Sequence, residues 1–285
     1  MRWNDMRQSD NVEDRRSGGG GLPIGGLSIG GMVVVAVISL LLGQNPLEIL
    51  GLMQSASQHP TNQAAQPRTQ PTNDEGKRFV SAILGDTEDT WDHLFKQAGS
   101  HYERPTLVLF RDAVSSACGR ASSAVGPFYC PGDKKVYLDL GFFDELQRRF
   151  AAPGDFAQAY VIAHEVGHHI QNLMGVSGQV HRKQQALGKK AANALSVQLE
   201  LQADCLAGVW GHYAQQRKLL DPGDMAEALT AAHAIGDDTL QRNATGHVVP
   251  DAFTHGSSEQ RMYWFKRGFE AGDMRRCDTF SAAKG

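Results

Sequence analysis

The sequence predicts an α+β protein, in which a mostly helical domain with a small β-sheet over residues 74–285 follows one N-terminal transmembrane helix and a polar linker. A charge-free apolar stretch near the N-terminus, two short β-type runs and long segments with helical periodicity support this assignment. The length of 285 residues allows one main domain with attachments, because single hydrophobic cores rarely exceed about 250 to 300 residues.

The composition excludes two broad classes of protein. With 28 Lys and Arg against 31 Asp and Glu, the chain lacks the basic excess that neutralises phosphates, so nucleic acid is not an expected partner. Hydrophobic residues make up 41% of the chain, which is enough to build a core and excludes wholesale disorder.

The N-terminal region contains no charged residue between Arg16 and Glu48. Inside this gap, residues 22–43 are predicted to form a transmembrane helix, because about 20 apolar residues are enough to cross a bilayer. A cleaved signal peptide is the alternative, with the Ser-Ala-Ser at 55–57 as a cleavage site. The apolar stretch is longer than a typical signal core, and this favours an uncleaved anchor.

The charges around this stretch predict its orientation. Arginines at positions 2, 7, 15 and 16 precede it, and no Lys or Arg follows it before Arg68. The positive-inside rule therefore predicts a cytoplasmic segment over residues 1–21 and a domain on the far side of the membrane. Residues 44–73 form the expected linker, since they become rich in Gln, Ser, Thr, Pro and Asn from Gln54 onward.

The four cysteines agree with an oxidising compartment, where they could form two disulfides in any of three connectivities. We expect Cys118 to pair with Cys130, and Cys205 with Cys277.

Within the domain, apolar periodicity and turn signals predict the order of the elements. The expected elements are an amphipathic helix after Asp74, strands over 106–110 and 135–140, and later helices that begin near Asp155, Asp224 and Ser257. The second strand could pair with an extended substrate if it is an edge strand, or it could be a fully paired inner strand.

The segment from His164 to His168 has the form H-E-x-x-H. Residues four apart share one face of a helix, so both imidazoles can reach one zinc ion, while Glu165 can contact a zinc-bound water. Chance placement of 11 His and 11 Glu in 285 residues gives roughly 0.016 matches, which argues against coincidence. His169 is rotated off the ligand face and is expected to be a surface residue or a neighbour of the site.

A catalytic zinc ion needs a third protein ligand. A third histidine in the H-E-x-x-H-x-x-G-x-x-H pattern is excluded, because Gln171 and Met174 occupy the required positions. Glu200 follows His168 by 32 residues and stands four residues before Asp204, so a second helix could supply Glu200 as the ligand and Asp204 as a hydrogen-bond partner of a ligand histidine. An exposed helical pair is the alternative.

These motifs resemble a known family. The segments AHEVGHHIQ at 163–171 and ELQADCLAG at 200–208 resemble the gluzincin-type zinc peptidases. The whole chain is more similar to the neutral zinc metallopeptidase family of bacterial membrane-anchored proteins. The further matching segments are RWNDMRQSDNVEDRR at 2–16, VYLDLGFFDEL at 136–146, GDD at 236–238 and THGSSEQR at 254–261. The resemblance implies a zincin-like fold, Glu200 as the third ligand and Asp204 as its supporting partner.

The expected activity is zinc-dependent hydrolysis of a peptide or protein substrate, with Glu165 as the general base. His255, in a loop before a predicted helix, is the first candidate to stabilise the oxyanion, and Arg261 and Tyr263 are the reserves. A histidine that only fixes the loop is the alternative for His255. The resemblance places the protein in the bacterial inner membrane with its domain in the periplasm or outside the cell.

Two other functions remain open from the sequence. The first is a zinc hydrolase that acts on a non-peptide amide such as a cell-wall component. The second is a membrane-tethered zinc-binding protein without catalysis, which would require a fourth protein ligand to close the site. The sequence does not predict the oligomeric state.

Overall fold

A computed structural model of the chain describes residues 1–16 and 74–282. The expected transmembrane helix over 22–43 and linker over 44–73 lie outside the described residues. No helix within the described ranges is both long and apolar enough to cross a bilayer.

The main sheet has four strands in the order β1, β2, β6, β5. Strands β1 (Val12–Asp14), β2 (Thr106–Phe110) and β6 (Lys135–Asp139) run parallel, and β5 (Phe128–Cys130) pairs antiparallel to β6. The hairpin of β3 (Ala113–Ser116) and β4 (Gly119–Ser122) lies between β2 and β5 in the sequence. Both predicted strands form, and β6 is an inner strand, so β5 forms the edge nearest the helices.

The rest of the described chain is mainly helical. Its longer helices are α3 (Glu75–Gln97), α4 (Gly141–Arg148), α5 (Asp155–Leu173), α6 (Val176–Gln184), α7 (Lys189–Gln216), α8 (Asp224–Ala234), α9 (Asp237–Thr245) and α10 (Ser258–Ala271), and the short elements are η1 (Trp3–Asp5), η2 (Ser123–Val125), η3 (Pro250–Ala252), η4 (Met274–Cys277) and α11 (Thr279–Ala282). The predicted helix starts are confirmed. Asp74 caps α3 by accepting from the Lys77 amide, and Ser257 opens α10 with a capping box.

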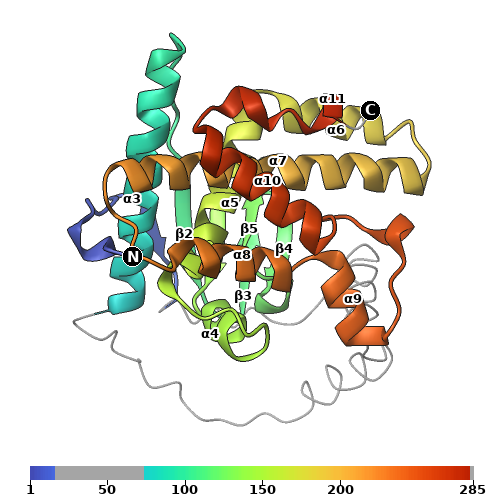
Figure 1. Cartoon of the computed structure of the whole chain (residues 1–285), viewed down its shortest axis with the longest axis horizontal. Helices are drawn as coiled ribbons and strands as arrows, with labels where there is room; N and C mark the ends of the chain where they lie inside the picture. Colours follow the sequence, from blue (N-terminus) through green and yellow to red (C-terminus); the bar gives the residue numbers. More distant parts are fainter. Residues whose placement is uncertain (17–73, 283–285) are drawn as a thin grey trace.

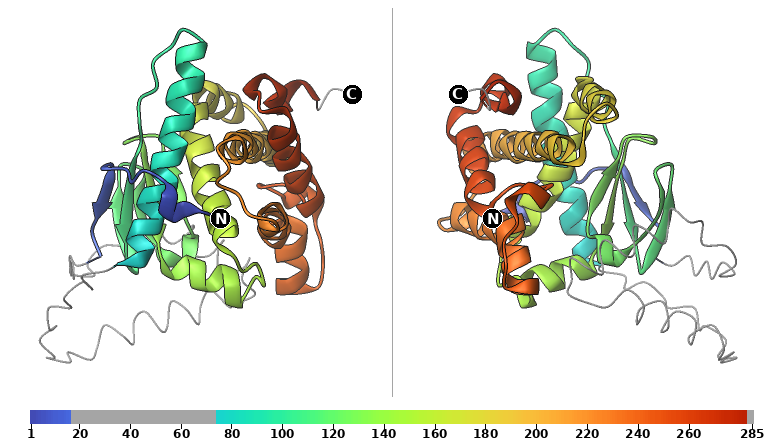
Figure 2. Two further views of the ribbon diagram at one scale, coloured as in Figure 1. Left: turned by 60° about the vertical axis from the view of Figure 1, so that its left-hand side comes forward. Right: turned by 90° about the vertical axis from the view of Figure 1, so that its right-hand side faces the viewer.

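The helices pack in layers against the sheet. Figure 2 shows the strands on one side of the molecule, with α3 and α5 beside them and α7, α8 and α10 beyond. Helix α7 runs across α5 in Figure 1, and α10 lies along α7. The core between α5 and α7 includes Phe156 and Trp210, which stack with ring centroids 5.7 Å apart and are both fully buried. This crossing sets the geometry of the residues that α5 and α7 present to each other.

Glycines allow these helices to approach closely. A Cβ atom at Gly167 would lie 2.9 Å from the Ala203 carbonyl oxygen on α7. At the next contact, a Cβ atom at Gly268 would lie 1.9 Å from the Cys205 carbonyl oxygen. Only glycine permits the backbones of α5, α7 and α10 to come together at these points.

Both expected disulfides are confirmed. Cys118 bonds to Cys130, with a sulfur–sulfur distance of 2.01 Å, and joins the β3–β4 hairpin to the edge strand β5. Cys205 bonds to Cys277, at 2.04 Å, and fixes η4 against α7. The described chain therefore has no free cysteine.

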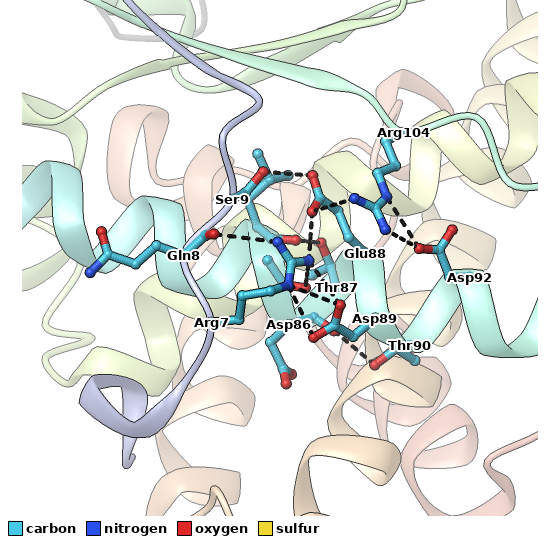
Figure 3. Close-up of polar contacts among 12 residues, drawn as sticks. Arg7, Gln8, Ser9, Asp86, Thr87, Glu88, Asp89, Thr90, Asp92 and Arg104 are labelled. Carbon is cyan, nitrogen blue, oxygen red and sulfur yellow. Dashed lines mark hydrogen bonds and ion pairs between the residues drawn. The ribbon is translucent and has the colours of Figure 1, made fainter.

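The first 16 residues are part of this domain, which differs from the expected separate segment over 1–21. Strand β1 extends the sheet, and Arg7 pairs with the buried Glu88 of α3 at 2.8 Å (Figure 3). Glu88 also accepts a hydrogen bond from Ser9 at 2.6 Å. Short motifs and periodicity do not indicate this docking, because the pairing joins residues about 80 positions apart.

The glycine contacts yield a test of the packing. The variant Gly268→Ala forces a side chain into the Cys205 backbone, so we expect the free energy of unfolding to fall by about 1 to 3 kcal/mol or more. Gly188→Ala is the matched control, because its added Cβ atom meets no heavy atom within 4 Å. Chemical denaturation measures both, and equal stability of the two variants would contradict the close approach of α7 and α10.

Candidate metal centre

Three predicted ligands converge where α5 and α7 cross. His164 and His168 lie one turn apart on α5, and the Glu200 carboxylate of α7 faces both, with Oε2 3.1 Å from His164 Nε2 and Oε1 3.4 Å from His168 Nε2. One ligand atom from each residue lies within 4.8 Å of the others. Ligand atoms around a tetrahedral zinc ion are about 3.3 Å apart, so this donor set fits zinc.

The site is partly open to solvent. The His164 side chain is 8% exposed, whereas His168 and Glu200 are 16% and 18% exposed. Water or a substrate can therefore approach from the side of His168 and Glu200.

Asp204 holds His164 in place. Its Oδ1 lies 2.8 Å from His164 Nδ1 and accepts from the Tyr160 hydroxyl at 2.5 Å, and its Oδ2 accepts from Arg261 Nε at 2.9 Å. Burial alone would raise the pKa of Asp204, but Arg261 and His164 outweigh this effect and lower the pKa to about 2. A charged carboxylate at Nδ1 fixes the tautomer that leaves Nε2 free for a metal.

Gln171 supports His168 in the same way. Its Oε1 lies 2.9 Å from His168 Nδ1, and its Nε2 donates to the Leu199 carbonyl at 2.6 Å and to Gln202 Oε1 at 3.1 Å. Gln202 in turn donates to the Cys277 carbonyl at 2.9 Å, next to the disulfide. In the sequence, Gln171 serves only to exclude a third histidine, although its position three residues after His168 indicates a shared helix face.

Glu165 lies between the two histidines on α5 and is 7% exposed. Within the described part of the chain, its carboxylate has no hydrogen-bond or ion-pair partner. It is therefore not committed to a structural contact and remains available to a water or substrate at the site.

His255 lies in the loop between η3 and α10, with its side chain 52% exposed. Asp237 shapes this loop, because its Oδ2 accepts from the amides of Thr254, His255 and Gly256 at 2.7, 2.6 and 3.0 Å. Burial lowers the pKa of His255, but its contact with Asp237, at 3.3 Å, and the nearby Glu200 carboxylate raise it overall. The geometry thus brings His255 near the ligand set.

Arg261 and Tyr263, the other two candidates for oxyanion stabilisation, lie elsewhere. Arg261 is 3% exposed and is held by Asp204, so it supports the ligand shell. Tyr263 is 54% exposed, and its hydroxyl accepts from Arg267 on the outer face of α10. Therefore neither the Arg261 guanidinium nor the Tyr263 phenol is free to contact an oxyanion on the metal-facing side.

His169 is buried, so the surface position, one of the two expected for it, is wrong. Its Nε2 lies 2.6 Å from the Glu103 carbonyl, and its Nδ1 lies 3.0 Å from the hydroxyl of Tyr129 on β5. Asn172 donates to the same hydroxyl at 3.0 Å. These contacts fix the edge strand β5 beside α5.

The fold and the site define a protein with an H-E-x-x-H helix that is crossed by a second helix, on which a glutamate faces both histidines. The chain belongs to the family described as "Putative neutral zinc metallopeptidase", whose model matches residues 1–280. It is similar to uncharacterized protein YpfJ of Escherichia coli K12, with 49% identity over 98% of this chain and 99% of the relative. It is also similar to uncharacterized protein Rv2575 of Mycobacterium tuberculosis H37Rv, with 44% identity over 74% of each chain. No solved structure gives a significant match.

Gln171 provides a test of the ligand support. Gln171→Met keeps the size of the side chain but removes its three hydrogen bonds, so we expect zinc affinity to fall about 10- to 100-fold. Competition with a chromophoric chelator measures this, and Gln215→Met, at an exposed position of α7, is the control. Unchanged affinity in Gln171→Met would contradict the role of Gln171.

Asp204 provides a test of the buried charge pair. Asp204→Asn leaves Arg261 without a countercharge, so we expect the free energy of unfolding of the metal-free protein to fall by about 3 to 5 kcal/mol. Adding Arg261→Met should restore most of this loss, and the surface variant Lys266→Met should leave stability unchanged. An Asp204→Asn variant as stable as the parent would show that the pair does not hold the helices together.

Proposed function

We propose that the protein is a membrane-anchored metallopeptidase that hydrolyses peptide bonds, with His164, His168 and Glu200 as ligands of one zinc ion. The observation that carries this proposal is a three-residue donor set with the uncommitted Glu165 beside it. Structural zinc sites are usually closed by four protein ligands, whereas catalytic sites keep a position for water. Among the described residues, the cluster contains three donors.

The mechanism assigns one task to each side chain. A zinc ion held by His164, His168 and Glu200 would lower the pKa of a coordinated water to about 7. Glu165 would accept a proton from the attacking water and deliver it to the departing amine. His255, held by Asp237, donates a hydrogen bond to the oxyanion that forms on the substrate carbonyl. Asp204 and Gln171 keep the two imidazoles aimed at the metal.

The edge strand β5 favours a peptide over another amide. Within the described chain it pairs with β6 on one side only, and His169 fixes it beside α5. An extended peptide can add to such an edge through main-chain hydrogen bonds.

The two disulfides support a domain in the periplasm or outside the cell, because such bonds persist in oxidising compartments. We propose that residues 22–43 attach this domain to the bacterial inner membrane.

The activity is tested with the purified full-length protein in detergent. We expect the parent to hold one zinc ion and to cleave casein or a peptide library, while Glu165→Gln keeps zinc but loses activity about 10²- to 10⁴-fold, because no base accepts the proton. We expect Glu200→Ala to lose both zinc and activity. The control Glu259→Gln, at an exposed position of α10, should behave like the parent.

Metal content by elemental analysis and hydrolysis rates are measured on the same samples. Full activity in Glu165→Gln with zinc bound would contradict the mechanism. Hydrolysis of cell-wall amides but not of any peptide would favour the non-peptide alternative, and bound zinc without any hydrolysis would favour the binding protein.

A further inference from the structure

The first 16 residues contribute a strand to the sheet that supports the metal centre. Strand β1 pairs in parallel with β2, and the Leu107 amide donates to the Asn11 carbonyl at 2.8 Å. Farther along, the Arg15 amide donates to the Leu109 carbonyl at 2.8 Å. These bonds satisfy the outer edge of β2, which would otherwise be exposed.

A buried carboxylate on α3 depends on the same segment. Glu88 is fully buried and is paired with Arg7 at 2.8 Å and Ser9 at 2.6 Å (Figure 3). The side chain of Asn11 also donates to Glu88, at 2.7 Å. The remaining cation, Arg104, is 3.7 Å away. An ionised carboxylate is costly to bury without such partners, so the packing of α3 requires the N-terminal segment.

The two ends of the intervening sequence meet. Arg16 is the last described residue before this intervening sequence, and Asp74 is the first described residue after it. Arg16 forms ion pairs with Asp74 and with Asp14. Lys77 of α3 also lies 3.5 Å from Asp14. The chain therefore leaves and returns at one place on the domain.

The arginines that predicted a cytoplasmic N-terminus have structural partners instead. Each of the four forms an ion pair within the described residues, and the pairs are Arg2 with Asp5, Arg7 with Glu88 and Asp89, Arg15 with Glu13, and Arg16 with Asp14 and Asp74. Their positive charges are thus explained by the fold, and the positive-inside argument loses its basis.

We propose that residues 1–16 and the metal centre lie on the same side of the membrane. A single crossing of the hydrocarbon core would separate Arg16 from Asp74 by about 30 Å, whereas the structure joins them in an ion pair. The disulfides identify this side as the periplasm or the exterior. This inference does not depend on zinc or on hydrolysis.

The first experiment maps the sides in whole cells that carry the full-length protein. Asp10→Cys lies on the N-terminal segment and Lys183→Cys on α6, and both positions are exposed. The native cysteines are all in disulfides, so a membrane-impermeant maleimide reports on the new thiol alone. We expect both variants to react in intact spheroplasts. If one variant reacted before permeabilisation and the other only after it, the proposal would be overturned. If both reacted only after permeabilisation, the assignment of this side to the periplasm or the exterior would be wrong.

The second experiment tests the contact itself in membrane vesicles. Lys135 Nζ lies 2.6 Å from Glu13 Oε1, so a carbodiimide should couple β6 to the N-terminal segment, as read by mass spectrometry. Lys190 and Asp251, 3.0 Å apart within the domain, form the internal positive control. Glu13→Gln should abolish the first cross-link and keep the second. If the parent formed the control cross-link but not the Glu13 cross-link, the N-terminal segment would not be docked.

The third experiment tests the role of the apolar stretch. Deletion of residues 22–43 should move the protein from the carbonate-washed membrane fraction to the soluble fraction, with both cross-links retained. A deletion variant that stays in the membrane would overturn the assignment of this stretch to the bilayer.

Discussion

The structure depends most on the buried carboxylate of Asp204. It lies on α7, accepts from Tyr160 and contacts His164 on α5, and pairs with Arg261 on α10. One side chain therefore joins the three helices that form the metal centre. Because an unpaired buried charge is costly, these helices are held in the arrangement that also aims His164 Nε2 at Glu200.

The same rule of paired buried charge operates on the far side of the core. Glu88 holds the N-terminal segment to α3 as Asp204 holds α10 to α7, although only Asp204 touches a predicted metal ligand. Glycines make both arrangements possible, since Gly85 allows the Arg7 carbonyl to approach α3 and Gly167 allows α7 to approach α5. Packing and polar pairing thus depend on each other throughout the domain.

Local signals predicted much of this from the sequence. The H-E-x-x-H spacing, the Glu200–Asp204 pair and the cysteine pairing rest on short motifs and a known compartment rule, and the structure brings these residues together as expected. Contacts between distant segments were not accessible in this way. Docking of residues 1–16, the inner position of β6 and burial of His169 each depend on partners dozens of positions away, and no periodicity in one sequence records such pairs.

The central claim is a zinc ion held by two imidazoles and one carboxylate, with a fourth position for water. X-ray absorption at the zinc edge of the zinc-loaded, full-length protein tests it most directly. We expect two nitrogen ligands at about 2.0 to 2.1 Å with imidazole scattering, the remaining ligands being oxygen, and no sulfur. Three or four imidazoles, or any zinc–sulfur distance near about 2.3 Å, would contradict it.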